Sequence, residues 1–482
     1  MKKSKILIGC LALVLGVSCT QDFEEINTNP NAPVAVQPEL LLRQVIYDFG
    51  EQMSYEGFVA GDLLSQHRTA IDLNLFDRHA LKSPQLGGNP WPIFYTNLRD
   101  NEILLKQSRI IETQRVYEGP ALILKAYMAQ GLTDLFGDVP YFEAFDGVLG
   151  TVTAAYDDQE DIYLGENGIL DNIDKGTAAL KNYNGAVGLQ GDLLFGGNLD
   201  GWIKFANSLK LKALMRIAAK VDVADEVNGI FQSGEFIQAN AENATFDFTA
   251  SAPNSFRLAQ LRVGDFNNFV LSETMDEILT QLDDPRLNTF FRTVNNGQAT
   301  TFNGLINGID ASQTSIELGN YSLAGTAFRE SPSNLDANFI TAWETQFILA
   351  EAAEKGFISA DAEALYELGV RQAFAYWFTE LPSDYLEGPA AFNAPGTTPL
   401  QQIATQKWIA NLINGYEGWI EFRRTGFPEF KSISASLNEG LIPVRMPYPA
   451  DEAALNAANY EPAAAATGGN SLNVEVWWDE EN

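Results

Sequence analysis

The two cysteines of this 482-residue chain, Cys10 and Cys19, both lie near its start. Residues 1–5 are basic, and the twelve residues 6–17 form an uninterrupted apolar run. That run is too short for the ~20 residues of a membrane-spanning helix, but it suits the apolar core of a secretory signal. We therefore expect residues 1–18 to be removed on export. The mature chain would then keep one thiol, which cannot form an internal disulfide.

Cys19 follows the small residue Ser18, as the acceptor cysteine of a bacterial lipoprotein does. The match is imperfect, because Gly16 stands where such signals usually carry Leu, and Leu15 lies one place early. The alternative is a soluble secreted protein in which Cys19 has no special role. Several acyl chains, at ~0.8 kcal/mol per buried methylene, would anchor the protein durably. Three acids behind the cysteine resemble the tag that sends some lipoproteins to the outer face of the outer membrane: Asp22, Glu24 and Glu25.

Residue types that carry catalysis or bind metals are scarce. His67 and His79 are the only histidines, and the HExxH, GxSxG and P-loop patterns are absent. We expect both histidines to be solvated or hydrogen-bonded loop residues. The acids of residues 156–163 fail as a calcium loop, since Ile162 and Gly168 stand where Gly and Glu are required. The sequence thus predicts neither a metal nor a cofactor, although its 63 acids leave open the carboxylate pair of a glycosidase.

The charge of the chain excludes one class of partner. Residues 1–18 hold three Lys and no acids, so the mature chain has 28 basic and 63 acidic residues, a net charge of −35. Such a field repels phosphate backbones, and we expect no nucleic acid partner. Residues 19–38, rich in Asn, Pro and acids, read as an extended tether. No linker divides residues 39–482, which we interpret as one folded domain.

Apolar spacing predicts helices in most of that domain. Residues 121–142 and 202–220 each carry the i, i+3, i+4, i+7 stripe of a buried helical face. Residues 339–378, with Phe339 on the first stripe, read as an antiparallel helix pair like one degenerate tetratricopeptide unit.

Two further patterns concern helix starts and loops. Asp157 and Glu160 have the spacing of a capping box that opens another helix. Residues 57–95 and 295–330 lack helical or strand periodicity and are predicted to be long loops, which usually carry function.

Eight segments together resemble the SusD/RagB family of surface lipoproteins, and most closely its second, SusD-like subgroup. They are Cys19 followed by "NTNPNAP", "WPIFYTNLRDNEILL" at 91–105, "AYMAQGLTDLFGDVPYFEAF" at 126–145, "YDDQEDIY" at 156–163, "GGNLDGWIKFANSLKLKALMRI" at 196–217, "QKWIANLINGYEGWIEFRRTGFP" at 406–428, "IPVRMPYPADEAALNAANY" at 442–460, and "VWWD" at 476–479.

The resemblance implies a mainly α fold, with a tetratricopeptide-like helical-repeat scaffold of four helix pairs and long irregular ligand-binding loops. It implies a lipid anchor in the outer membrane, facing the cell exterior. Such a protein performs no covalent chemistry: it captures a nutrient oligosaccharide and delivers it to a SusC-like TonB-dependent transporter. The alternatives are a SusD-like binder of peptides, a surface glycoside hydrolase, and a structural surface protein without a soluble ligand.

Most family motifs are interpreted as parts of the scaffold. Arg423 and Arg424 are expected to brace buried carbonyls or carboxylates, and the terminal "WWD" to pack the C-terminus down.

Neutral sugars pair aromatic platforms with polar groups, and the 57–95 stretch offers both. Trp91 is the foremost candidate, because Pro90 and Pro92 flank it and disfavour a helix there, which would hold the indole at a loop edge. A core position is the alternative for each aromatic, and Tyr95 lies four residues after Trp91, as on one helix face. The predicted ligand-binding residues are Asp72, Phe76, Arg78, Asn89, Trp91 and Tyr95.

Overall fold

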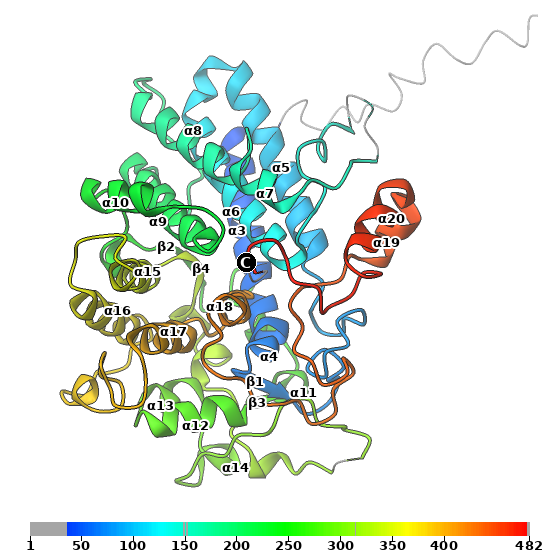
Figure 1. The fold of residues 1–482 in the computed structure, drawn as a ribbon, viewed down its shortest axis with the longest axis vertical. Helices are drawn as coiled ribbons and strands as arrows, with labels where there is room; N and C mark the ends of the chain where they lie inside the picture. The colour runs from blue at the N-terminus through cyan, green and yellow to red at the C-terminus, as the bar shows by residue number, and fades with distance from the viewer. Residues whose placement is uncertain (1–35, 148–149, 151–152, 314, 480–482) are drawn as a thin grey trace, which may run out of the picture.

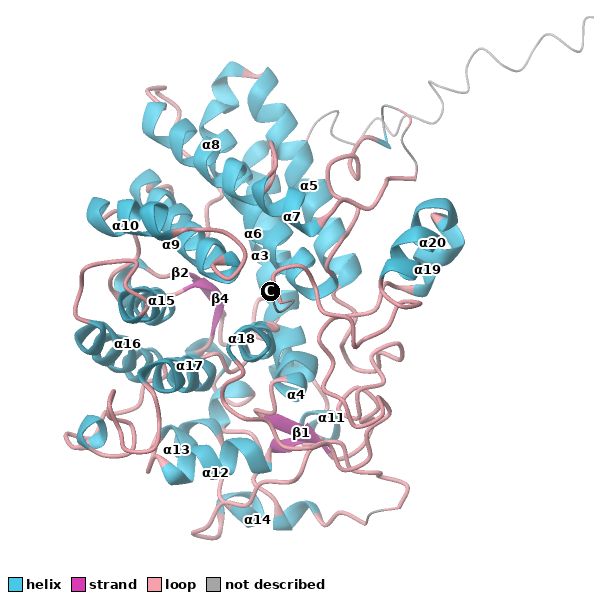
Figure 2. Ribbon diagram, viewed as in Figure 1, coloured by secondary structure: helices cyan, strands magenta, loops and turns pink. Residues whose placement is uncertain are grey.

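The computed structural model describes residues 36–147, 150, 153–313 and 315–479. The predictions for the signal, Cys19 and most of the tether lie outside these residues. The predicted mainly α fold is confirmed: helices surround a single large core, with a few short strands (Figures 1 and 2). The longer helices are α3 (Pro38–Glu56), α5 (Trp91–Ile110), α6 (Glu118–Phe136), α8 (Ile169–Asn182), α9 (Leu199–Ile217), α10 (Ala224–Ser233), α12 (Glu273–Gln281), α15 (Ala342–Glu354), α16 (Ala362–Tyr376), α17 (Pro399–Ala410), α18 (Glu417–Thr425) and α20 (Ala457–Ala466).

Short helices and strands fill the connections. The short helical segments include a π-helical turn (Gly57–Gly61), α4 (Asp62–Leu64), the 3₁₀ helix η2 (Glu112–Tyr117), α7 (Gln159–Leu164), α11 (Val263–Phe266), α13 (Arg286–Phe290), α14 (Val294–Gly297) and α19 (Ala450–Leu455). Two antiparallel pairs of strands are formed by β1 (Arg68–Ala70) with β3 (Phe269–Leu271), and by β2 (Ala244–Asp247) with β4 (Asp336–Ile340).

The two strongest helix predictions are confirmed by α6 and α9. Phe205 and Leu209 of the predicted α9 stripe are fully buried. Helix α6 ends at Phe136 because Gly137, at φ 76°, takes the left-handed half of backbone space that a residue with a Cβ rarely adopts.

The predicted helix pair is confirmed as α15 and α16, but its start is wrong. Phe339 belongs to strand β4, because residues 336–340 pair with β2, and α15 begins only at Ala342. The helices cross closely at a glycine: a Cβ on Gly369 would come within 2.8 Å of the Phe347 ring.

The predicted capping box is also wrong. Helix α7 begins at Gln159 with Asp158 as its N-cap residue. The carboxylate of Asp157 instead accepts the backbone N–H groups of Tyr141 and Phe142, each at 2.9 Å, and so fastens the turn that follows α6.

The predicted loop 57–95 is shorter than expected. Its first residues, 57–64, continue the helix that starts as α3, and Trp91 already belongs to α5. The 295–330 stretch is irregular apart from short turns, as predicted, and it supplies Leu305, Ile309 and Leu323 to a small apolar cluster with Val270 of β3.

Both histidines are buried and hydrogen-bonded. Of the two alternatives given for them, exposure to solvent is therefore wrong and hydrogen bonding is right. The Nε2 atom of His67 lies 2.8 Å from the carbonyl oxygen of Trp408, and the Nδ1 atom of His79 lies 3.1 Å from that of Leu441. Burial lowers the pKa of His79 to about 4.

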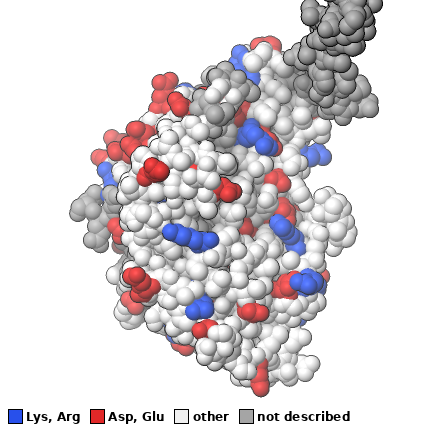
Figure 3. Space-filling view, turned by 90° about the vertical axis from the view of Figure 1, so that its right-hand side faces the viewer, with Lys and Arg blue, Asp and Glu red and all other residues white. Residues whose placement is uncertain are grey.

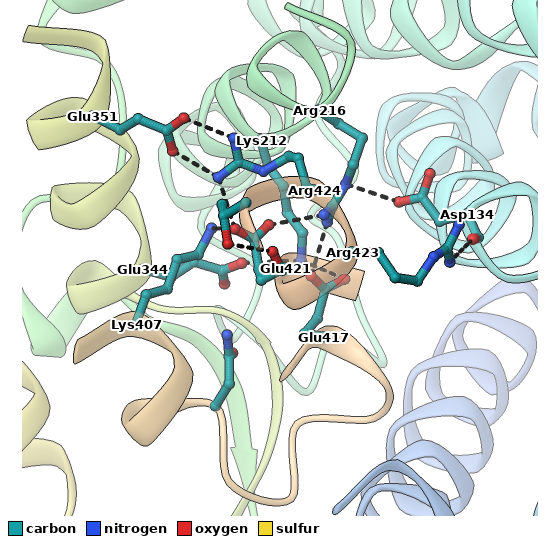
Figure 4. Close-up of polar contacts among 12 residues, drawn as sticks. Asp134, Lys212, Arg216, Glu344, Glu351, Lys407, Glu417, Glu421, Arg423 and Arg424 are labelled. Atoms are coloured by element: carbon teal, nitrogen blue, oxygen red, sulfur yellow. Dashed lines mark hydrogen bonds and ion pairs between the residues drawn. The ribbon is translucent and has the colours of Figure 1, made fainter. Parts of the chain in front are cut away.

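Buried charges join the helices at the centre of the molecule (Figure 4). Lys212 on α9 forms ion pairs with the carboxylates of Glu344 on α15 at 3.0 Å and of Glu417 on α18 at 2.9 Å. One turn later on α9, Arg216 pairs with Glu417 at 2.9 Å and with Asp134 on α6 at 3.1 Å. Four helices that are distant in sequence thus share one set of ion pairs.

Glu421 on α18 is the most highly connected acid of this network. Its carboxylate pairs with three cations: Arg216 at 2.8 Å, Arg424 at 2.8 Å and Lys407 on α17 at 3.2 Å. Burial alone would raise the pKa of Glu421, but these cations hold it well below its usual value. Arg424 also pairs with Glu351 on α15 at 2.6 Å and lowers the pKa of that carboxyl to about 2 despite its burial.

The two arginines do what the sequence predicted. Arg424 braces the two buried carboxylates just described, and Arg423 donates to the carbonyl oxygen of Asp134 at 2.8 Å and to the carboxylate of Asp479 at 3.0 Å. The guanidinium of Arg423 also lies 4.6 Å from the ring centre of Trp478, so the C-terminal motif packs down as expected.

Substitution of Glu421 tests how much the ion-pair network contributes to the free energy of unfolding. Glu421→Ala would leave three buried cations without their shared carboxylate, and breaking a buried pair in this way costs about 3–5 kcal/mol. We expect the free energy of unfolding in urea to fall by that amount. Glu367→Ala, which removes an exposed i, i+4 pair with Arg371, should change it by less than about 0.5 kcal/mol. If the two substitutions changed the free energy of unfolding equally, the stabilising role of Glu421 in the ion-pair network would be contradicted.

A second prediction concerns the facing carboxylates of Asp247 and Asp336 in the β2–β4 pair. Burial and the charge of Asp247 raise the pKa of Asp336 to about 7. The folded chain therefore holds this proton more tightly than an unfolded chain, in which Asp titrates near about 3.9. The resulting stabilisation is complete below about pH 4 and is lost as the pH rises through 7.

Asp336→Asn should therefore raise the free energy of unfolding by roughly 1–2 kcal/mol at pH 8, and by about a third of that amount at pH 5. Urea denaturation at the two pH values measures this difference. Asp384→Asn, at an exposed position, serves as the control and should change the free energy of unfolding little at either pH. An Asp336→Asn effect that is the same at both pH values would contradict the raised pKa of Asp336.

Candidate functional site

An open pocket of about 440 Å³ lies between the loop before α5 and the segment that leads into α19. We name it the Trp91 pocket. Its aromatic lining consists of Trp91, Phe136, Tyr448 and Tyr460, and its exposed polar lining of Lys82, Asn89 and Asp451. Pro84, Pro90, Pro447 and Pro449 stiffen its walls.

Trp91 is held in the wall of this pocket by helix packing. The prolines were predicted to disfavour a helix at Trp91 and to hold the indole at a loop edge. That prediction is wrong, because the first turn of a helix tolerates proline: Pro90 is the N-cap residue of α5 and Pro92 lies in the first turn. The Trp91 side chain is 9% exposed and meets the Phe136 ring edge-on at 4.9 Å between centroids. The indole is thus part of the core and of the pocket lining at once.

Tyr95 continues the same helix face, which was the alternative given for it. Its ring lies 4.7 Å from that of Trp91, and its hydroxyl donates to the carbonyl oxygen of Pro140 at 2.7 Å. Tyr95 therefore supports Trp91 from behind and does not line the pocket itself.

Tyr448 forms the opposite wall and is fixed at several points. Its hydroxyl donates to the carbonyl oxygen of Asp138 at 2.8 Å, and its backbone N–H donates to the side chain of Asn470 at 2.8 Å. The Tyr156 ring lies 4.9 Å away, and the Tyr156 hydroxyl donates to Glu452 on α19 at 3.0 Å. This wall is preformed.

The loop that carries Asn89 is held in place by a hydrogen bond to Glu56 of α3. The buried carboxylate of Glu56 accepts the backbone N–H of Gly88 at 2.8 Å and the hydroxyl of Tyr416 at 2.5 Å. Burial raises the pKa of Glu56. Gly88 has φ 92°, and a Cβ there would come within 2.4 Å of the Phe76 ring, so the turn requires glycine.

The structure divides the six predicted ligand residues. Asn89 and Trp91 line the pocket, with Tyr95 behind them, whereas Phe76 is a buried core residue below Gly88. Asp72 and Arg78 do not line the pocket. The backbone of Asp72 is tied to the Asn268 side chain, and Arg78 donates to the carbonyl oxygen of Ala435 at 2.8 Å.

Sequence reasoning missed the second wall of the pocket. The motif that contains Tyr448 was assigned to the scaffold, which is correct for its hydrogen bonds but incomplete. One signal was present: Tyr448 lies between Pro447 and Pro449, as Trp91 lies between Pro90 and Pro92. The two proline-flanked aromatics meet across the pocket, at 6.2 Å between ring centroids.

The surroundings suit an uncharged ligand with flat apolar faces and hydroxyl groups. Figure 3 shows the side of the molecule on which α19 and α20 lie, where charged side chains are scattered over a largely uncharged surface. Aromatic walls offer C–H contacts, while Asn89 and Asp451 offer hydrogen-bond partners. Among the described residues, no group of three or more His, Cys, Asp or Glu side chains is placed to hold a metal ion.

No described helix combines the length and the apolar character needed to cross a bilayer.

Comparison with known proteins identifies the fold and the family. A family model named SusD-like, described as starch-binding and associating with the outer membrane, matches residues 30–449. A solved chitin-binding protein shares 25% identity, with a TM-score of 0.77 over 92% of this chain and 100% of its own. A SusD homologue from Bacteroides fragilis shares 23% identity, with a TM-score of 0.80 over 93% of this chain and 100% of its own.

A second SusD homologue from Bacteroides fragilis has the same fold, at 22% identity and a TM-score of 0.80 over 92% of this chain and 100% of its own. No curated protein sequence matches significantly. Because the family model covers most of the chain, this protein belongs to the SusD-like family of proteins that associate with the outer membrane.

Proposed function

We propose that this protein captures a neutral oligosaccharide in the Trp91 pocket and delivers it to a SusC-like TonB-dependent transporter. The observation that carries the proposal is the pairing of aromatic walls with an exposed polar rim in a preformed pocket of about 440 Å³. Sugar rings stack on such walls through their C–H faces, and their hydroxyls bond to the rim. The family description and the chitin-binding neighbour support a glycan as the ligand.

The pocket favours a glycan over the other candidates. Its rim shows no cluster of cations for an acidic peptide, and Asp451 is the sole carboxylate among its lining residues. A glycosidase needs two carboxylates across the bound sugar. We therefore propose binding without covalent chemistry.

The site is tested by Asn89→Ala, which changes an exposed residue and should leave the melting temperature unchanged. Loss of one or two hydrogen bonds should weaken binding roughly 2- to 12-fold in titration calorimetry. The probes are maltoheptaose and chitohexaose, followed by a glycan array if neither binds. Asp72→Ala, also exposed but outside the pocket, is the matched control and should bind at full affinity.

Trp91→Ala extends the test to the aromatic wall. Removing a stacking platform should weaken binding by roughly 5- to 150-fold, by analogy with aromatic stacking on nucleobases. Because the indole is 9% exposed, the same change should also cost about 3–5 kcal/mol of stability, so affinity must be measured well below the melting temperature. If Asp72→Ala weakened binding while Asn89→Ala bound at full affinity, the proposed pocket would be contradicted and the ligand site would be assigned to residues 72–78.

Delivery to a transporter requires that the protein stay on the membrane, and we propose that Cys19 carries the lipid. Cys19→Ala should release the protein into the soluble fraction and abolish metabolic labelling with palmitate. Replacing Asp22, Glu24 and Glu25 with Ala should keep the label but reduce digestion by externally added protease. Unchanged retention and labelling of Cys19→Ala would contradict the anchor.

A further inference from the structure

A second pocket lies between α12, α17 and the loops at residues 389–397 and 427–429. It has a volume of about 370 Å³, and we name it the Gln402 pocket. It shares no lining residue with the Trp91 pocket, and Figure 1 shows α12 and α17 well apart from α19. The two pockets are therefore separate sites.

Gln402 on α17 holds one wall of this pocket in place. The residue is 3% exposed, and its Nε2 atom donates to the carbonyl oxygen of Pro389 and to the hydroxyl oxygen of Thr397, each at 3.0 Å. Thr398 and Gln401 form a capping box at the start of α17, which fixes the same turn. This wall is thus formed before any ligand binds.

The pocket is lined by hydrogen-bonding groups that the fold does not use. Although Nε2 of Gln402 is bonded twice, no described residue donates a hydrogen bond to its amide oxygen. The hydroxyl of Thr405 and the amide of Gln281 also lack a partner among the described residues. The free oxygen of so deeply buried a side chain needs a donor, which water or a ligand that replaces it can supply.

Apolar surface lies beside these polar groups. Phe427 lines the pocket, is half-buried, and stacks on no other aromatic ring of the described chain. Pro389 and Pro428 stiffen the backbone around it. Aromatic surface next to amide and hydroxyl groups is the combination that accommodates the C–H faces and the hydroxyls of a sugar.

The composition of this pocket parallels that of the Trp91 pocket. Each combines aromatic surface, prolines, neutral hydrogen-bonding side chains and a single carboxylate, which is Asp451 in the Trp91 pocket and Glu429 in the Gln402 pocket. The lining of the Gln402 pocket includes no Lys, Arg or His, so an anionic ligand would find no opposite charge there. The same class of uncharged ligand therefore suits both pockets.

We propose that the Gln402 pocket is a second binding site for a neutral saccharide. A sugar hydroxyl donates to the free amide oxygen of Gln402, neighbouring hydroxyls bond to Thr405 and Gln281, and a C–H face packs against Phe427. The inference rests on the proposed function for the class of ligand, and it adds that one protein molecule holds a glycan polymer at two places. Because a polymer repeats the same unit, the second contact strengthens polymer binding without new contacts in the Trp91 pocket.

The test removes free hydrogen-bonding groups of the Gln402 pocket and leaves the core intact. Gln281 is exposed, and Thr405→Val keeps the shape of a half-buried side chain whose hydroxyl has no partner in the described chain. Gln281→Ala combined with Thr405→Val should therefore leave the melting temperature unchanged. Affinity electrophoresis in gels that contain amylopectin or glycol chitin measures polymer binding, and we expect the dissociation constant of this double variant to rise roughly tenfold or more.

The matched control makes the same two changes outside both pockets. Gln232 is exposed on α10, and Thr177 is half-buried on α8 with a hydroxyl that has no partner. Gln232→Ala combined with Thr177→Val should migrate in the polymer gels as the wild-type protein does. Wild-type migration of the Gln402-pocket variant, or an equal loss of polymer binding in the control, would overturn the proposal.

Asn89→Ala, alone and combined with the Gln402-pocket variant, separates this inference from the proposed function. We expect each change to weaken polymer binding and the combination to abolish it. If only Asn89→Ala weakened binding, the second site would be overturned while the Trp91 pocket stands. If only the Gln402-pocket variant weakened binding, the second site would stand and the Trp91 pocket would be contradicted. If neither polymer nor any glycan of an array bound the wild-type protein, both proposals would fail.

A peptide is the other ligand that amide and hydroxyl groups could hold. Titration calorimetry with a tryptic digest of casein distinguishes it from a saccharide. If the wild-type protein bound these peptides and the Gln402-pocket variant did not, at unchanged polymer affinity, the pocket would be assigned to peptides and the proposal would be overturned. We expect no peptide binding that depends on Gln281 or Thr405.

Discussion

The buried ion-pair network around Glu421 is the interaction on which the rest of the structure depends. It joins α6, α9, α15, α17 and α18, which the chain supplies from positions 118 to 425, and Arg423 extends it to Asp479 at the C-terminus. Removing so many charges from water is costly, and each remains favourable only while its partners stay in place. The network therefore specifies one arrangement of the helices.

That arrangement positions the Trp91 pocket. Helix α6, held by Asp134, carries Phe136, which meets Trp91 edge-on, and the turn after α6 supplies the carbonyl groups that fix Tyr95 and Tyr448. Most lining aromatics are thus anchored by hydrogen bonds or by core packing. A preformed pocket loses less entropy on binding than a loop that must become ordered, which suits capture of a dilute nutrient.

Much of the scaffold could be predicted from the sequence, because the stripes of α6 and α9 and the pair α15 and α16 are local patterns. The roles of Arg423 and Arg424 were also predictable, since paired arginines beside buried aromatics need carboxylates. The start of α15 was not, because Phe339 is drawn into β4 by pairing with a strand some 90 residues earlier. The second pocket wall was missed because Tyr448 and Trp91 are brought together only by tertiary packing, across more than 350 residues.

A crystal structure of the protein with a bound oligosaccharide tests the central claim most directly. The account predicts a sugar ring in the Trp91 pocket, packed against the indole, with hydroxyl groups bonded to Asn89 or Asp451. A glycan bound in the 72–78 loop, or elsewhere on the surface with the Trp91 pocket unoccupied, would contradict it.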